Sequence, residues 1–64
     1  MKRYKFLTES SQEIIIYHDK DLTLEFMKAK NQDHKFLQIT DCKTGYVTTF
    51  VTSKIVAIQF NYNA

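Results

Sequence analysis

Short segments in which apolar and polar side chains alternate recur along almost the whole chain, and this pattern limits the possible folds most strongly. Ile, Val, Thr, Tyr and Phe dominate these segments and proline is absent, a composition that suits pleated strands with one face buried. The sequence therefore predicts an all-β domain of about six short antiparallel strands. The expected strands cover residues 2–8, 13–18, 22–27, 37–40, 46–52 and 56–61.

The size of the chain limits how this sheet can be completed. With 64 residues it is expected to form one domain, 1–64, and a chain this short removes only about 60% of its unfolded surface on folding. A single cysteine excludes an internal disulfide, and bare sheet edges are templates for pairing with other chains. We therefore expect a meander or a small barrel, with edges paired between subunits.

The segment from Phe36 to Phe60 has a recognisable order of elements. It contains a strand, a tight hairpin, a second strand, a short break at Ser53-Lys54 and a last strand. This order resembles the second half of an SH3-like or Sm-like small barrel, in which a single helical turn separates the last two strands. The resemblance carries no diagnostic motif, so it implies a fold and no functional residues.

Two short motifs bear on local structure. Ser10 and Glu13 have the spacing of a helix capping box, but three consecutive isoleucines follow and favour a strand, so the helix remains the alternative there. Asp41 can accept hydrogen bonds from backbone amides two or three residues later, and Gly45 can adopt a positive φ. The stretch between them is therefore expected to be a hairpin turn with a bulge.

The sequence lacks residues that several classes of function require. His18, His34 and Cys42 do not show the spacing of a zinc site, and one glycine is too few for a phosphate-binding loop, so we expect no metal and no cofactor. The carboxylates lie mostly in expected turns, and a chain this small has little room for a closed ligand pocket. The longest apolar run is too short to cross a membrane. The sequence thus favours a protein that is not an enzyme and is not embedded in a membrane.

Apolar residues occupy both faces of two expected strands. One face of each of the strands at 13–18 and 46–52 can enter the core, and the remaining face would be exposed, where apolar patches usually mark interfaces. The last strand could also pair with the edge of a neighbouring chain. The alternative is a curled sheet that buries both faces. The predicted protein-interface residues are Ile15, Tyr17, Tyr46, Phe50 and Tyr62.

The basic N-terminus supports a second hypothesis. Small barrels bind single-stranded nucleic acid with aromatic side chains that stack on bases and cations that contact phosphates, and here cations flank Tyr4 and Phe6. The alternative is that both aromatic side chains enter the core and leave the cations in solvent. A net charge of +2 permits a polyanionic ligand without requiring one. The candidate phosphate contacts are Lys2, Arg3, Lys5 and Lys35.

The leading hypothesis is a non-catalytic small binding or regulatory protein, of the type of a bacterial or phage accessory inhibitor. It would form homo-oligomers and act through a protein–protein interface. The absence of an apolar segment after the basic N-terminus argues against a signal peptide, and a free thiol is typical of a reducing compartment, so a cytoplasmic location is expected. The alternative function is a nucleic-acid-binding or nucleotide-binding small β-barrel that uses the N-terminal cations and aromatic stacking.

Overall fold

A computed structural model describes residues 1–61 of the chain. The expectation of a mostly β chain built from short antiparallel strands is confirmed, but this range contains five strands and one α-helix in place of six strands. The capping-box alternative near Ser10 is not realised, because Glu13 begins a strand. The elements in order are β1 (Lys2–Thr8), β2 (Glu13–His18), α1 (Leu22–Asn31), β3 (Phe36–Thr40), β4 (Val47–Val51), the 3-10 turn η1 (Thr52–Lys54) and β5 (Ile55–Asn61).

β1 is the central strand of a three-stranded sheet with the order β2-β1-β5. Tyr4 lies opposite Ile16 of β2, and Tyr4 and Phe6 are both buried because side chains two positions apart share one face of a strand. Arg3 and Lys5 consequently face the other side of the sheet. The aromatic residues of the basic N-terminus are therefore core residues and are not available to stack on a base.

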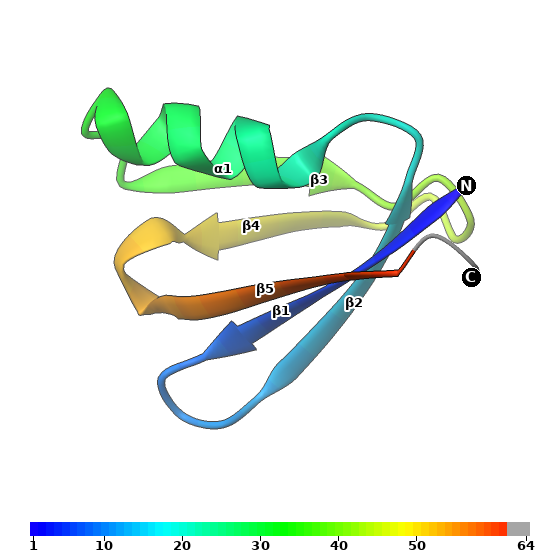
Figure 1. Cartoon of the computed structure of the whole chain (residues 1–64), viewed down its shortest axis with the longest axis horizontal. Helices are drawn as coiled ribbons and strands as arrows, with labels where there is room; N and C mark the ends of the chain where they lie inside the picture. Colours follow the sequence, from blue (N-terminus) through cyan, green and yellow to red (C-terminus); the bar gives the residue numbers. More distant parts are fainter. Residues whose placement is uncertain (62–64) are drawn as a thin grey trace.

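β3 and β4 form a separate two-stranded sheet. Figure 1 shows this hairpin above β5 and β1, with α1 running alongside β3. Because no strand ladder joins the two sheets within residues 1–61, they do not close into a barrel. The short helical turn that the sequence pattern predicted between the last two strands is confirmed as η1. The fold thus contains the expected hairpin and short helical turn. It does not contain the closed barrel, which was one of the two expected forms.

The segment expected to form the third strand is the helix α1. Leu22, Phe26 and Ala29 are buried along one side of it, and their spacing is that of a helix face. The side chain of Asp21 accepts a hydrogen bond from the backbone N–H of Leu24 at 3.1 Å and caps the helix. In a strand Leu24 would share the buried face with Leu22 and Phe26, whereas it is exposed here. The expected strand is therefore wrong, since the helical period fits these residues and their N-cap better.

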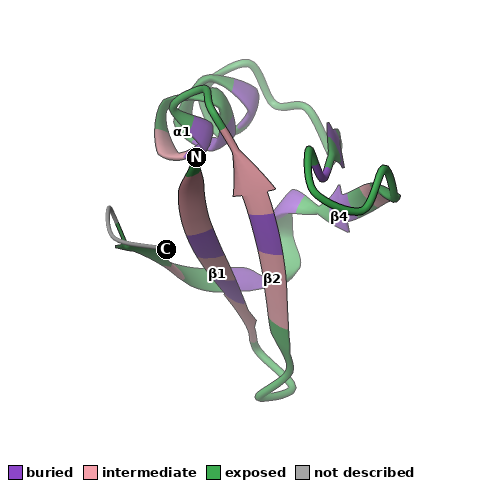
Figure 2. Ribbon diagram, turned by 90° about the vertical axis from the view of Figure 1, so that its right-hand side faces the viewer, coloured by how far each residue is buried: buried purple, intermediate pink, exposed green. Residues whose placement is uncertain are grey.

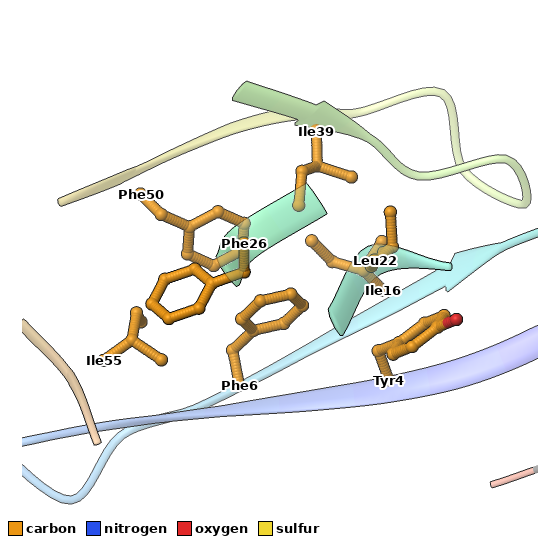
Figure 3. Close-up of a cluster of buried hydrophobic side chains, with 8 residues drawn as sticks. All are labelled: Tyr4, Phe6, Ile16, Leu22, Phe26, Ile39, Phe50 and Ile55. Carbon is orange, nitrogen blue, oxygen red and sulfur yellow. The ribbon is translucent and has the colours of Figure 1, made fainter. Parts of the chain in front are cut away.

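The hydrophobic core lies between the three-stranded sheet, α1 and the β3–β4 hairpin (Figure 3). The Phe6 ring stacks on that of Phe50 with 4.5 Å between centroids, and it meets the Phe26 ring edge-on at 6.3 Å. In Figure 2 the buried positions of β1 and β2 lie in the middle of each strand, and the loop that joins them is exposed. The buried core residues are Tyr4, Phe6, Ile16, Leu22, Phe26, Ile39, Phe50 and Ile55.

Phe50 is a core residue and not the exposed interface residue that the sequence suggested. Its side chain is 2% exposed, and the β3–β4 register places it opposite Leu37 on the inward side of the hairpin. Alternation then turns Val47 and Val51 outward. The sequence grouped the residues of β4 correctly by face, but period alone does not say which face meets the core.

Candidate functional site

The turn between β3 and β4 is built around the side chain of Asp41. Its Oδ1 accepts hydrogen bonds from the backbone N–H of Lys43 at 2.7 Å and of Thr44 at 2.9 Å. Gly45 adopts a φ of +79° and donates its N–H to the carbonyl of Asp41 at 2.8 Å. The predicted hairpin turn is confirmed, and both Asp41 and Gly45 have structural roles in it.

The same aspartate connects the turn to β2. Its Oδ2 accepts a hydrogen bond from the backbone N–H of Tyr17 at 3.2 Å, and the N–H of Cys42 donates to the Tyr17 carbonyl at 2.8 Å. Burial raises the pKa of the Asp41 carboxyl, but the hydrogen bonds from the N–H groups of Thr44, Tyr17 and Lys43 and from the Thr44 side chain outweigh it and hold the pKa below its ordinary value. The carboxylate is therefore ionised, and both of its oxygens accept hydrogen bonds from backbone N–H groups.

One candidate surface is the side of the three-stranded sheet that faces away from the core, here called the open sheet face. Its side chains are all half-buried or exposed, and they are grouped by the registers of β1 with β2 and β5. Two cations lie on the central strand, with aromatic, aliphatic, amide and carboxylate side chains on either side. The Nζ of Lys5 lies 3.3 Å from the Oε1 of Glu13 and forms an ion pair with it. The open sheet face consists of Arg3, Lys5, Leu7, Glu13, Ile15, Tyr17, Ala57, Gln59 and Asn61.

The open sheet face brings together residues from both sequence-based hypotheses. Arg3 lies opposite Tyr17, and Lys5 lies opposite Ile15, so two predicted interface residues are cross-strand neighbours of two predicted phosphate contacts. The Nζ of Lys43 lies 4.6 Å from the centroid of the Tyr17 ring, which adds a third cation beside the face. The structure thus combines, on one face of a sheet, side chains that the sequence had assigned to different functions.

The remaining predicted phosphate contacts lie elsewhere. The Nζ of Lys2 donates to the carbonyl of Asp19 at 3.1 Å. Lys35 lies in the connection between α1 and β3, at the opposite end of the hairpin from the Asp41 turn, and its carbonyl accepts from the N–H of Thr52 at 3.0 Å. Lys35 borders a separate depression of about 620 Å³ next to Phe36. The four predicted cations therefore do not form one patch.

A second candidate surface is the outward side of the β3–β4 hairpin, here called the outer hairpin face. Among its residues Phe36 and Val47 are each 61% exposed and Val51 is 41% exposed, and the adjoining Tyr46 is 76% exposed. The Nε2 of Gln38 donates to the Thr49 Oγ1 at 3.1 Å across the middle of this face. The outer hairpin face consists of Phe36, Gln38, Thr40, Val47, Thr49 and Val51.

Most of the outer hairpin face was missed in the sequence. Tyr46 is exposed as predicted, but Val47 and Val51 were grouped on the opposite side of the strand from the residues chosen as anchors, and Phe36 was not considered. Tyr62, the remaining predicted interface residue, lies outside the described residues. The outer hairpin face could have been predicted from the lack of charged residues in the stretches 36–40 and 47–51. Without charges, both faces of each strand are compatible with burial.

Comparisons with protein-family models, with curated proteins and with solved structures find no match to this chain. Among residues 1–61, no helix is both long and apolar enough to cross a membrane. In the same range, no group of three or more His, Cys, Asp or Glu side chains is arranged to hold a metal ion. Function must therefore be argued from the two surfaces just described.

Proposed function

We propose that the protein is a non-catalytic binding protein that associates with itself and occupies the surface of a partner protein. The observation that carries this proposal is the uncharged outer hairpin face, where Phe36 and Val51 are exposed as a pair at one end and Val47 is exposed at the other. Large apolar side chains that are exposed close together and surrounded by polar residues often mark an interface. Strand edges paired between copies, as expected from the sequence, are part of the proposal.

The class of protein that we propose is a small accessory regulator or inhibitor of bacterial or phage origin that works in the cytoplasm. Its support is the size and composition of the chain. A non-catalytic role is supported by Asp41, whose pKa is held below its ordinary value by hydrogen bonds. Its oxygens are held by backbone amides of the fold, so they are not directed at a substrate.

The first test is the mass in solution by light scattering at low and high salt. We expect a dimer or larger assembly that is insensitive to salt, because the outer hairpin face carries no charged side chain. The double substitution V47S/V51S should weaken the assembly, whereas V56S, which removes a still more exposed valine from β5, should not. A monomer at all protein concentrations would overturn the self-association.

A second candidate function is the binding of single-stranded nucleic acid on the open sheet face. The observation that favours it is the cross-strand pair of Arg3 and Tyr17 with Lys43 over the tyrosine ring, since cations beside an aromatic side chain suit a phosphate backbone and a base. Anisotropy of a labelled single-stranded oligonucleotide should then fall steeply with salt. R3A should weaken this binding more than K28A, which removes an exposed charge from α1.

A further inference from the structure

The depression next to Phe36 lies at the end of the β3–β4 hairpin that is remote from the Asp41 turn. Its walls are the connection from α1 to β3 on one side and the end of β4 with η1 on the other. In Figure 1 these segments meet at the left-hand end of the molecule, where α1 ends and β4 runs into η1. Pockets for small molecules have volumes of roughly 300–1,000 Å³. At about 620 Å³, the depression is large enough to hold one.

Hydrogen bonds join the two walls of the depression. The N–H of His34 donates to the carbonyl of Ala29 at 2.9 Å and fastens the connection to the end of α1. The Oγ1 of Thr52 donates to the carbonyl of His34 at 2.8 Å, and the N–H of Thr52 donates to the carbonyl of Lys35 at 3.0 Å. Thr52 is itself buried. The backbone around the depression is therefore fixed by the fold, as is usual for ligand sites.

Two lysines line the depression. Lys30 lies in the last turn of α1, where a cation also suits the negative end of the helix, but Lys35 lies outside the helix and has no such role. Within residues 1–61 neither ammonium group forms an ion pair. One carboxylate, that of Asp33, lines the same depression. Since the lysines outnumber it, the local charge favours an anionic ligand.

The part of the wall that belongs to the hairpin is apolar. Phe36 and Val51 lie opposite each other on β3 and β4, and both are exposed. A simple inorganic anion would contact the lysines and leave these two side chains in water. A flat ring that stacks on Phe36 would remove apolar surface from water on both partners. The depression therefore suits a ligand that carries both an anionic group and an aromatic ring.

We infer that the depression binds a mononucleotide. Its phosphate contacts the ammonium groups of Lys30 and Lys35, and its base stacks on the ring of Phe36. The ribose hydroxyls donate to the side-chain oxygens of Asp33 and Ser53, which complete the polar lining. An aromatic carboxylate without hydroxyl groups would leave these two oxygens without a counterpart. The inference goes beyond the proposed self-association and does not require it, and it gives Lys35, a phosphate contact predicted from the sequence, a site at which its charge acts.

The test is a titration of the isotope-labelled chain followed by NMR, with adenosine monophosphate, adenosine and inorganic phosphate as three separate probes. Adenosine monophosphate should shift the amide signals of residues 33–36 and 51–53 with a Kd of about 1 mM or tighter, the upper end of the usual range for metabolites. Adenosine and phosphate should each bind at least about fivefold more weakly, because each lacks one of the two contacts. The protein is kept dilute, since a second copy on the outer hairpin face would compete for Phe36.

Substitutions separate the contacts of the nucleotide. Lys30→Ala and Lys35→Ala should each weaken the binding of adenosine monophosphate by about three- to fivefold, and Phe36→Ala should weaken it by about fivefold or more. The matched control is Lys28→Ala, which removes an exposed charge from the same helix outside the depression and should leave the Kd unchanged. All four side chains are exposed, so the variants should retain the fold, and their amide spectra check this.

The possible results separate this site from the two proposed functions. Phosphate that binds as tightly as adenosine monophosphate would overturn the nucleotide and leave a simple anion site. Shifts confined to β1, β2 and β5 would overturn the depression as the site and support the open sheet face. A Kd weaker than about 1 mM, or an equal loss in Lys28→Ala and Lys35→Ala, would overturn the inference, whereas the self-association is decided independently by light scattering.

Discussion

The Oδ2 of Asp41 accepts a hydrogen bond from the backbone N–H of Tyr17, and so joins two sheets that share no strand ladder. The carbonyl of Tyr17 accepts in turn from Cys42, so both backbone groups of one residue at the end of β2 are held by one turn. The placement of the β3–β4 hairpin relative to the three-stranded sheet therefore depends on a single buried carboxylate together with the apolar core.

Replacing Asp41 with Asn should lower the free energy of unfolding by about 1–3 kcal/mol. The Asn oxygen can still accept from Lys43 and Thr44, but its NH₂ group cannot accept from Tyr17 and leaves that N–H unpaired. Urea denaturation followed by circular dichroism measures the change. The control is Asp19→Asn, because Asp19 is a largely exposed aspartate and its substitution should change little. Equal stabilities of the two variants would contradict the role given to Asp41.

The stability of the protein should fall in acid partly through the same residue. The pKa of Asp41 is lower in the folded chain than its ordinary value near pH 4, so the unfolded chain binds the proton more readily. The stabilising contribution is therefore complete above roughly pH 5 and is lost as the pH falls through the lower, folded-state pKa. Urea midpoints measured between pH 2 and 6 should depend less on pH in Asp41→Asn. A slope unchanged by the substitution would show that other carboxyl groups cause the acid sensitivity.

Two phenylalanines on opposite faces of the hairpin should respond very differently to truncation. Phe50→Ala removes a buried ring that stacks on Phe6 and should cost about 3–5 kcal/mol, which is a large part of the stability of a small domain. Phe36→Ala removes an exposed ring and should cost the monomer little. Thermal unfolding of both variants at low protein concentration makes the comparison. A larger loss for Phe36 would contradict the observed assignment of inner and outer faces.

The helix should depend on its N-cap. Asp21→Ala removes the hydrogen bond to the N–H of Leu24 and should destabilise the protein by about 1 kcal/mol, and Asp21→Asn should retain most of the stability because its amide oxygen can also accept. Chemical denaturation monitored at the helical signal tests this order. If both variants lost the same amount, the charge of Asp21 rather than its hydrogen bond would be responsible.

Much of the backbone could be predicted because its signals are local. The alternation at 2–8 and 13–18, the Asp41–Gly45 turn and the short break before the last strand each follow from a few neighbouring residues, and each is confirmed. The helix was missed because Leu22, Leu24 and Phe26 also fit a strand. The deciding signals were the possible cap at Asp21 and the third buried position of the helix at Ala29.

The candidate surfaces were harder to predict because they depend on contacts between distant segments. Ile15 and Tyr17 were correctly grouped on one face of β2, but their neighbours Arg3 and Lys5 are set by the pairing of β1 with β2. Phe50 and Val47 could exchange roles until the packing of Phe50 on Phe6 decides which face is buried. A single sequence carries the period of each strand, and the choice between its two faces comes from tertiary structure.

The pairing of β1 with β5 has a consequence for how the chain is made. The central strand of the larger sheet lies near the start of the chain and receives one of its two neighbours from residues 55–61. During synthesis, Tyr4 and Phe6 therefore cannot pair with β5 until some fifty further residues have been made. Contacts between residues so far apart in the sequence slow folding. Until β5 is synthesised, the nascent chain exposes one edge of its central strand. In this interval a chaperone, or an early encounter with another copy, would matter most.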